Sequence, residues 1–209
     1  MFVALAGDVA EVPPLLPEEE TLLSPRARPA RRHDLAMGRA AARLALARLG
    51  GPPAPIMRGP HREPLWPDGV VGSITHAAGH ALSAVAPVGE CGGLGLDLEH
   101  RGRFFPALAD HVAFAEEREW LAGCAEPDRP AATLALFSAK ETIYKAFFPR
   151  IGRFFGFTAA QVTPTTDRGT LTGRLLAPLD PSYPTTRTFS IDVAWSGDLV
   201  LTSLALPPG

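Results

Sequence analysis

Two carboxylates stand one residue apart at the end of the apolar run GLGLDLEHR, which begins at Gly93. In an extended chain alternate side chains point to the same side, so Asp97 and Glu99 would project from one face, about 7 Å apart along the strand. Neighbouring acids repel one another unless a positive charge lies close to both. Carboxylate oxygens are ligands of hard dications such as Mg²⁺, which also take phosphate oxygens. The spacing therefore predicts a divalent metal site that works on a phosphate.

A second group of charges lies in the segment AATLALFSAKETIYKAFFP, residues 131–149. Its apolar residues recur at the spacing of a helix with one buried face. Lys140, Glu141 and Lys145 lie on the opposite face. In isolation Glu141 and Lys145 are an ordinary i, i+4 ion pair worth about 0.2–0.5 kcal/mol. Together with the two strand acids, Glu141 is a candidate third metal ligand, and the lysines are candidate partners for phosphate.

Arginines follow an earlier helix, which the apolar spacing predicts from Ala30 to Leu49 and which the sequence GGPP ends. Arg32, Arg39 and Arg43 recur along it at i, i+7 and i+11. Such a row is either a solvated helix edge or a grip for phosphate, because guanidinium groups offer forked donors that match phosphate oxygens. The helix alone does not decide between the two interpretations.

The elements that must position these groups are short strands. Apolar runs predict strands from Val70 to Thr75 and from Ala81 to Ala86, with a third in CGGLGLDLE. His76 falls where the first strand ends, and it is either a cleft residue or a structural histidine bonded to the backbone. His80 does not make a metal pair with His76, because neither a helical frame nor a third ligand is present.

The remaining segments predict a mixed α and β chain. A helix is expected from about Pro106 to Ala122, and extended structure is expected in residues 170–179 and 188–206. Ser196, Gly197 and Asp198 have the composition of a hairpin turn within the last of these segments.

Composition limits the possible functions. The chain has 209 residues, 46% of them hydrophobic and 20% charged, which is enough for a substantial core. A net charge of -2 gives no general attraction to nucleic acid. Cys91 and Cys124 have neither pairing nor metal-binding spacing, which suits a reducing cytoplasm. No apolar stretch reaches the ~18 residues of a membrane span, and MFVALAGDVAEVPP is too short and uncharged for a secretory signal. We therefore expect a cytoplasmic protein without nucleic-acid or membrane partners.

Three blocks, GSITH, GLGLDLE and FSAKETIYKA, occur in this order. They resemble the signature blocks of 4'-phosphopantetheinyl transferases, of the bacterial type that activates siderophore synthetases and carrier proteins. Upstream, RRHDLAMGRAAARLALARLG and PIMRGPHREPLWPDGVVGS are similar to the N-terminal pattern of that subgroup, so the likeness covers about Arg31 to Pro149. Ala77 stands where the subgroup often has cysteine, and Arg58 where lysine is common. Neither difference removes an essential group.

The resemblance implies that the 4'-phosphopantetheine arm of coenzyme A is transferred to a serine of an apo acyl or peptidyl carrier protein, with release of adenosine 3',5'-bisphosphate. It implies an α+β fold of two similar α/β halves, residues 1–92 and 93–209, related by pseudo-twofold symmetry, with the active site between them and a monomeric chain. It also implies residue roles: Mg²⁺ held by Asp97, Glu99 and Glu141; catalysis by Glu141 as the expected base, with Lys145 and Asp97; coenzyme A held by Arg31, Arg39, Arg58, Thr75, His76, Lys140 and Lys145.

Two other activities would use the same residues. One is a Mg²⁺-dependent phosphodiester or pyrophosphate hydrolase with water as the nucleophile, and the other is a non-catalytic module that binds coenzyme A. Five phenylalanines either dock a helix of the carrier protein or belong to the core: Phe104, Phe105, Phe154, Phe155 and Phe157.

Overall fold

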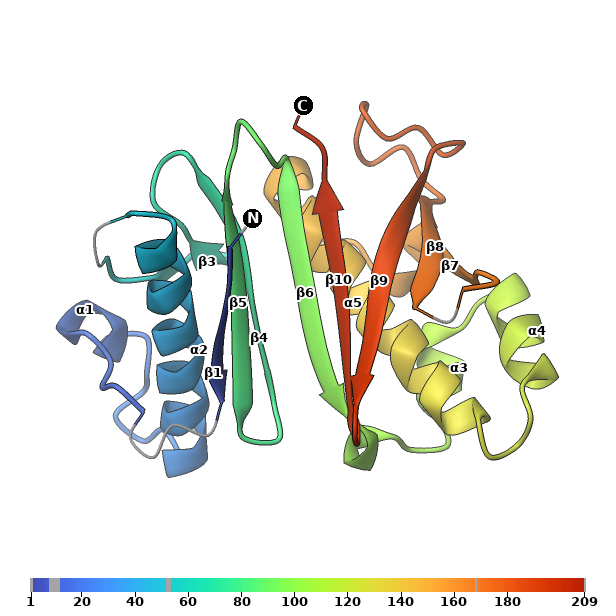
Figure 1. Ribbon diagram of the computed structural model, residues 1–209, viewed down its shortest axis with the longest axis horizontal. Helices are drawn as coiled ribbons and strands as arrows, with labels where there is room; N and C mark the ends of the chain where they lie inside the picture. Colours follow the sequence, from blue (N-terminus) through green and yellow to red (C-terminus); the bar gives the residue numbers. More distant parts are fainter. Residues whose placement is uncertain (1, 8–11, 52–53, 168, 209) are drawn as a thin grey trace.

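Two antiparallel sheets lie side by side along the middle of the molecule, each with a long helix packed against it (Figure 1). The structure, a computed structural model, describes residues 2–7, 12–51, 54–167 and 169–208. Residues 8–11 of the N-terminal stretch and Pro52–Pro53 of the predicted helix stop lie outside the described residues. None of the described helices has the length and apolar character needed to cross a membrane. The predicted mixed α and β chain is confirmed.

The first sheet has the order β1-β5-β4. Its β4–β5 hairpin occupies both predicted strand regions, and the predicted helix is confirmed as α2, whose Ala42 and Leu46 pack against Val85. The elements of this part are β1 (Phe2–Gly7), α1 (Pro17–Glu20), α2 (Pro29–Arg48), the two-stranded ribbon of β2 (Met57–Arg58) and β3 (Pro64–Leu65), β4 (Val70–Ala77) and β5 (His80–Pro87).

The second sheet has the order β6-β10-β9-β8-β7. The predicted helix over residues 131–149 is confirmed as α5, and the hairpin turn is confirmed between β9 and β10, where Gly197 has φ of 57°. The elements are β6 (Gly93–His100), the 3-10 turn η1 (Arg101–Arg103), α3 (Leu108–Val112), α4 (Glu116–Gly123), α5 (Arg129–Ile151), the 3-10 turn η2 (Phe157–Ala159), β7 (Ala160–Pro164), β8 (Thr170–Leu175), β9 (Thr188–Ser196) and β10 (Leu199–Leu206).

The prediction of one helix from Pro106 to Ala122 is wrong. The chain forms two short helices, α3 and α4, because Ala115 between them has φ of 46°, which no α-helix accepts. The break turns Glu117 inward, where its carboxylate accepts a hydrogen bond from the Phe114 N–H. Strands β1 and β7 were not expected from the sequence.

Strand β6 presents two different faces. Its leucines, Leu94 to Leu98 at alternate positions, pack against β5. On the other face a Cβ added to Gly95 would lie 2.0 Å from the Thr142 carbonyl oxygen, and one added to Gly93 would lie 2.2 Å from that of Ala146. The glycines therefore let α5 approach the strand backbone closely. Asp97 and Glu99 follow on this same face.

The two sheets meet where β4 lies beside β6. Backbone groups do not form a ladder across this seam; instead, Ser73 Oγ accepts a hydrogen bond from Leu96 N at 3.0 Å, and Thr75 Oγ1 accepts one from Leu98 N at 2.9 Å. All four residues are buried. The hydroxyls thus satisfy two N–H groups at the edge of the second sheet and join the two sheets.

Candidate active site

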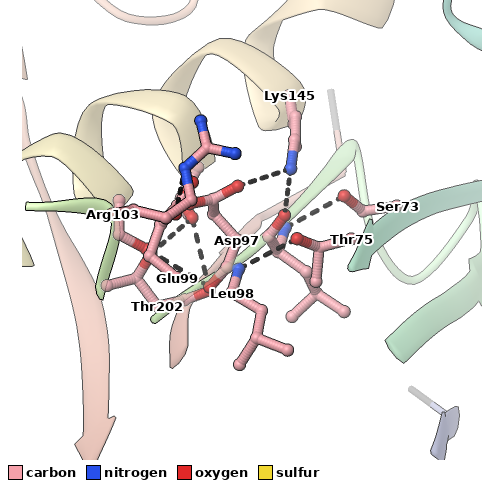
Figure 2. Close-up of polar contacts among 11 residues, drawn as sticks. Ser73, Thr75, Asp97, Leu98, Glu99, Arg103, Lys145 and Thr202 are labelled. Carbon is pink, nitrogen blue, oxygen red and sulfur yellow. Dashed lines mark hydrogen bonds and ion pairs between the residues drawn. The ribbon is translucent and has the colours of Figure 1, made fainter. Parts of the chain in front are cut away.

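The strand acids lie beside α5, as Figure 2 shows. Asp97 and Glu99 are both buried, and Lys145 of α5 donates to Asp97 Oδ1 at 2.7 Å and to the Leu96 carbonyl oxygen at 2.9 Å. Arg103 Nε lies 3.4 Å from Glu99 Oε2 as an ion pair. Asp97 Oδ2 and Glu99 Oε2 are buried without a hydrogen bond. Asp97 therefore has an oxygen with no partner among the described residues, whereas Glu99 Oε2 has only the ion pair with Arg103.

Burial and neighbouring charges shift the pKa values of Glu99 and Glu141. The pKa of Glu99 is raised to about 7, chiefly by burial and then by the charge of Asp97, while the charges of Arg103 and Lys145 lower it. Burial also raises the pKa of Glu141, while the Lys145 charge lowers it and that of Asp97 raises it. Glu141 is thus close enough to the strand pair to share its electrostatic field.

The residues fit a magnesium ion through two carboxylates. Among the described residues, no three His, Cys, Asp or Glu side chains form a group that could by itself hold a metal ion. The three acids therefore do not form a preassembled three-ligand cage, and Lys145 occupies one oxygen of Asp97. Mg²⁺ is commonly bound by one or two carboxylates together with waters and substrate phosphates. The buried carboxylates of Asp97 and Glu99, which lie on one face of β6, fit that requirement.

A basic pocket lies on the other side of the seam. It has a volume of about 220 Å³ and is lined by α2, β4 and the β2–β3 ribbon. Ile74 and His76 point into it from β4, whereas Ser73 and Thr75, at the alternate positions, point to β6. Its charged lining residues are Arg31, Asp34, Arg39, Arg58, Arg62 and His76.

The arginines of this pocket are crowded. Arg39 is buried, and its Nε has no hydrogen-bond partner. Burial lowers the pKa of Arg39 to about 10; Glu19 opposes the shift, while Arg58 and Arg31 add to it. Burial likewise lowers the pKa of Arg58, together with the charges of Arg31 and Arg62. Cations held this close favour an anion among them.

Partial loss of water around the His76 ring lowers its pKa, while Asp34 opposes the shift. Lys145 and Asp97, which belong to the acid site, also affect the pKa of His76. The basic pocket and the acid site therefore lie within electrostatic reach of each other.

A larger cavity of about 670 Å³ connects the two sites. It shares Arg62, Pro64 and Ile74 with the basic pocket, and it is also lined by Glu141 and Lys145. A third cavity of about 320 Å³, lined largely by aromatic and apolar residues, shares Glu141 with it. The larger cavity therefore adjoins both other cavities, and it brings Arg62 of the basic pocket to the same surface as Glu141 and Lys145 of α5.

Lys140 was expected to face the diphosphate, but its ammonium is already paired within the protein. Its Nζ pairs with Glu117 Oε2 at 2.7 Å and donates to the carbonyl oxygens of Phe157 and Ala160, both at 3.0 Å. The three protons of the ammonium are thus used by contacts to α4, η2 and β7, where the Lys140 and Glu117 side chains are each 1% exposed.

Other expected residues are also placed by these contacts. The Thr75 hydroxyl accepts a hydrogen bond from Leu98 N across the seam, and the residue does not line the basic pocket. Arg32 pairs with Glu20 and Arg43 with Glu19, so of the predicted arginine row only Arg39 lines the basic pocket.

The five phenylalanines divide between core and surface. Phe104, Phe155 and Phe157 pack against the main core, whereas Phe105 and Phe154 are exposed at 47% and 74%. Phe154, Phe155 and Phe157 also line the third cavity.

Sequence reasoning missed two cations of the site. Arg62 lines two of the cavities, and Arg103 pairs with Glu99. The charged turn GPHREP, which directly follows Arg58, was the available signal for Arg62. The signal for Arg103 was its position four residues after Glu99, but the intervening 3-10 turn was not readable from the pattern.

Comparison with known proteins agrees with this geometry. A family model described as the 4'-phosphopantetheinyl transferase N-terminal domain matches residues 18–86, and one described as the 4'-phosphopantetheinyl transferase superfamily matches residues 93–197. The chain is 41% identical over 196 residues to 4'-phosphopantetheinyl transferase Svp of Streptomyces mobaraensis, covering 92% of this chain and 78% of the relative. It is 36% identical over 201 residues to Npt of Nocardia iowensis, with 90% and 88% covered. It is 41% identical over 131 residues to enterobactin synthase component D of Salmonella typhimurium, with 62% and 53% covered. The chain therefore belongs to the 4'-phosphopantetheinyl transferase superfamily.

Proposed function

We propose that this chain transfers the 4'-phosphopantetheine group of coenzyme A to a serine hydroxyl of an apo acyl or peptidyl carrier protein, releasing adenosine 3',5'-bisphosphate. Family membership supports the reaction class. The structural observation that carries the proposal is the pair of buried carboxylates beside Lys145, together with a cavity that Lys145 and Glu141 line and that shares Arg62 with the pocket of arginines. A metal site next to a phosphate pocket suits a substrate with a diphosphate and a further phosphate.

The basic pocket would hold the phosphates of coenzyme A. Arg31, Arg39, Arg58 and His76 line it, and the unpartnered Nε of buried Arg39 offers a donor that only a ligand can satisfy. Guanidinium groups bind phosphate through two parallel hydrogen bonds, which fixes the ligand as well as attracting it. This holds the nucleotide end so that the diphosphate extends toward the acids.

The acids would hold Mg²⁺ through Asp97 and Glu99, with Glu141 nearby. When bound, Mg²⁺ supplies positive charge to the oxygens of the diphosphate. Lys145 uses two donors on Asp97 and the Leu96 carbonyl, which leaves one N–H for a phosphate oxygen. Preorganised cations of this kind are the main source of stabilisation in phosphoryl transfer.

Glu141 is the proposed base. It takes the proton of the carrier serine as the serine oxygen forms a bond to the phosphorus on the pantetheine side, and the bond from that phosphorus to the bridging oxygen breaks. The bridging oxygen leaves with adenosine 3',5'-bisphosphate. Burial raises the pKa of Glu141, which makes its carboxylate a stronger base than an exposed glutamate.

We also propose two similar α/β halves related by pseudo-twofold symmetry, with the boundary between residues 92 and 93. One long helix against an antiparallel sheet in each half supports this division, as do the two family models, which leave residues 87–92 unmatched between them. The seam of Ser73 and Thr75 hydroxyls would then hold the active site together. A monomeric state and a cytoplasmic location remain predictions of the sequence.

The test is a mass measurement of intact carrier proteins. Purified protein, Mg²⁺ and coenzyme A are mixed with several apo carrier proteins from siderophore, polyketide and nonribosomal peptide synthesis, and one of them should gain a single phosphopantetheine arm. Glu141→Gln should reduce the rate by about 10²–10⁴-fold, because it removes the base. Glu119→Gln on α4, an exposed glutamate, is the matched control and should retain full activity.

The other candidate activities give different results in the same experiment. Consumption of coenzyme A with no carrier gaining mass would indicate a hydrolase. Binding of coenzyme A that survives Glu141→Gln, with no product from either protein, would indicate a binding module.

A further inference from the structure

The backbone of Arg62 has an unfavourable conformation. Its φ of 74° lies in the left-handed region, which among the described residues only two other non-glycine residues share. A long unbranched side chain gains nothing from this region, which glycine adopts freely and asparagine and aspartate tolerate. The turn holds the conformation through hydrogen bonds from Gly59 N to Glu63 O at 2.8 Å and from Arg62 N to Gly59 O at 3.0 Å.

The side chain of Arg62 has no structural task in the described part of the chain. No described acid pairs with it, and no hydrogen bond of its guanidinium to a described residue is seen. It is exposed and adds positive charge beside Arg58. A strained residue that adds repulsion and makes no compensating contact is destabilising in the free protein, and a bound anion would offset this cost.

The position of Arg62 indicates which kind of ligand. It lines both the basic pocket and the larger cavity that contains Glu141 and Lys145. Of the charged residues of the basic pocket, Arg62 is the one that also reaches the cavity of the acid site. A guanidinium at this junction is placed for a ligand with phosphate groups in both cavities.

We propose that Arg62 binds a phosphate of coenzyme A at the junction of the two cavities, and that its strained turn exists to place this guanidinium there. The inference rests on the proposed function and adds a phosphate-binding residue to it. The strained turn is therefore a device for substrate affinity and contributes nothing to the stability of the free protein.

The test uses Arg62→Gly, which removes the guanidinium and relieves the strain together. The melting temperature of the free protein should stay equal or rise by about 1–3 °C. The Kd for coenzyme A, measured by titration calorimetry, should rise by about 10-fold to 100-fold, because one charge-assisted hydrogen-bonding group is lost. The Michaelis constant for coenzyme A should rise by a similar factor. An unchanged Kd, or a lower melting temperature, would overturn the proposal.

Two controls separate strain from binding. Ala115→Gly relieves a positive φ at the α3–α4 break and should raise the melting temperature without changing the Kd. Arg32→Ala removes an arginine of α2 that pairs with Glu20 and should change neither quantity. A weaker Kd in either control would also count against the assignment.

Titrations with analogues of coenzyme A show whether Arg62 binds the 3'-phosphate or the diphosphate. If Arg62 binds the 3'-phosphate, Arg62→Gly should lose affinity for coenzyme A and adenosine 3',5'-bisphosphate but not for 3'-dephospho-coenzyme A. If it binds the diphosphate, both coenzyme A forms should lose affinity equally. Because binding is measured without a carrier protein, failure of wild-type transfer would reject the proposed function while leaving the test of Arg62 readable.

Discussion

Glu99 should make the metal-free protein less stable as the pH rises. In the folded protein its pKa is raised from the ordinary 4.5 to about 7, chiefly by burial and then by Asp97. Because the folded state binds this proton more tightly than the unfolded state, the contribution of Glu99 to stability is fully present below about pH 4.5 and is lost as the pH rises through 7. At about 1.4 kcal/mol for each pH unit, the loss amounts to roughly 3 kcal/mol.

The measurement compares the wild type with Glu99→Gln during thermal unfolding in EDTA from pH 4.5 to pH 8. Glutamine imitates the protonated carboxyl, so the two proteins should unfold together at pH 4.5. At pH 8 the variant should melt about 6–12 °C higher, since 1 kcal/mol corresponds to about 2–4 °C in a domain of this size. Glu119→Gln, on the exposed face of α4, should follow the wild type at every pH.

Adding Mg²⁺ at pH 8 should stabilise the wild type more than Glu99→Gln, because the ion neutralises the buried carboxylate pair. If the difference in melting temperature between wild type and variant does not grow with pH, or if the variant is the less stable protein at pH 8, then ionising Glu99 in the folded protein carries no free-energy cost. The reasoning that it is available to a cation would then be refuted.

Three further substitutions test the contacts that position the site. Gly95→Ala should destabilise the protein by more than about 2 kcal/mol in urea unfolding and reduce activity, because its Cβ would lie 2.0 Å from a carbonyl oxygen of α5, whereas Gly89→Ala, with open space around it, should be neutral. Glu117→Ala should cost about 3–5 kcal/mol, because it leaves the buried Lys140 ammonium without its charged partner, and adding Lys140→Met should recover part of that loss. Thr75→Val should cost about 1–3 kcal/mol by leaving a β6 N–H unpaired, so an unchanged urea midpoint would show that the seam hydroxyl is dispensable.

Much of the architecture was predictable because its signals are local. The apolar spacing of α2 and α5 and the turn at Gly197 each depend on residues close together in the chain, and all three predictions were confirmed. The helix expected from Pro106 to Ala122 failed because the break at Ala115 follows from a distant contact. Glu117 turns inward to meet Lys140, and no pattern within the segment shows that partner.

The sequence indicated many residues of the candidate site, but it missed Arg62 and Arg103 and did not show the geometry. The block GLGLDLE showed which residues share a face, but the close approach of α5 follows from its glycines only when the helix is known to cross them. Lys140 and Lys145 look equivalent in sequence, since both lie on the polar side of the same helix. The structure distinguishes them, because Lys140 pairs with Glu117 and Lys145 pairs with Asp97.

The alternating residues of the block GSITH hold the basic pocket and the acid site at a fixed separation. In a strand, alternate residues face opposite ways, so Ser73 and Thr75 reach β6 while Ile74 and His76 face the basic pocket. A slip of one residue in β4 would exchange these faces and would put an apolar side chain and an imidazole against the N–H groups of β6. The hydroxyls that join the sheets therefore also fix the distance between the basic pocket and the acids. Because a bound ligand would span the seam, we infer that coenzyme A and the seam hydroxyls stabilise the same arrangement, so loss of Thr75 should weaken binding of coenzyme A although the residue does not line the basic pocket.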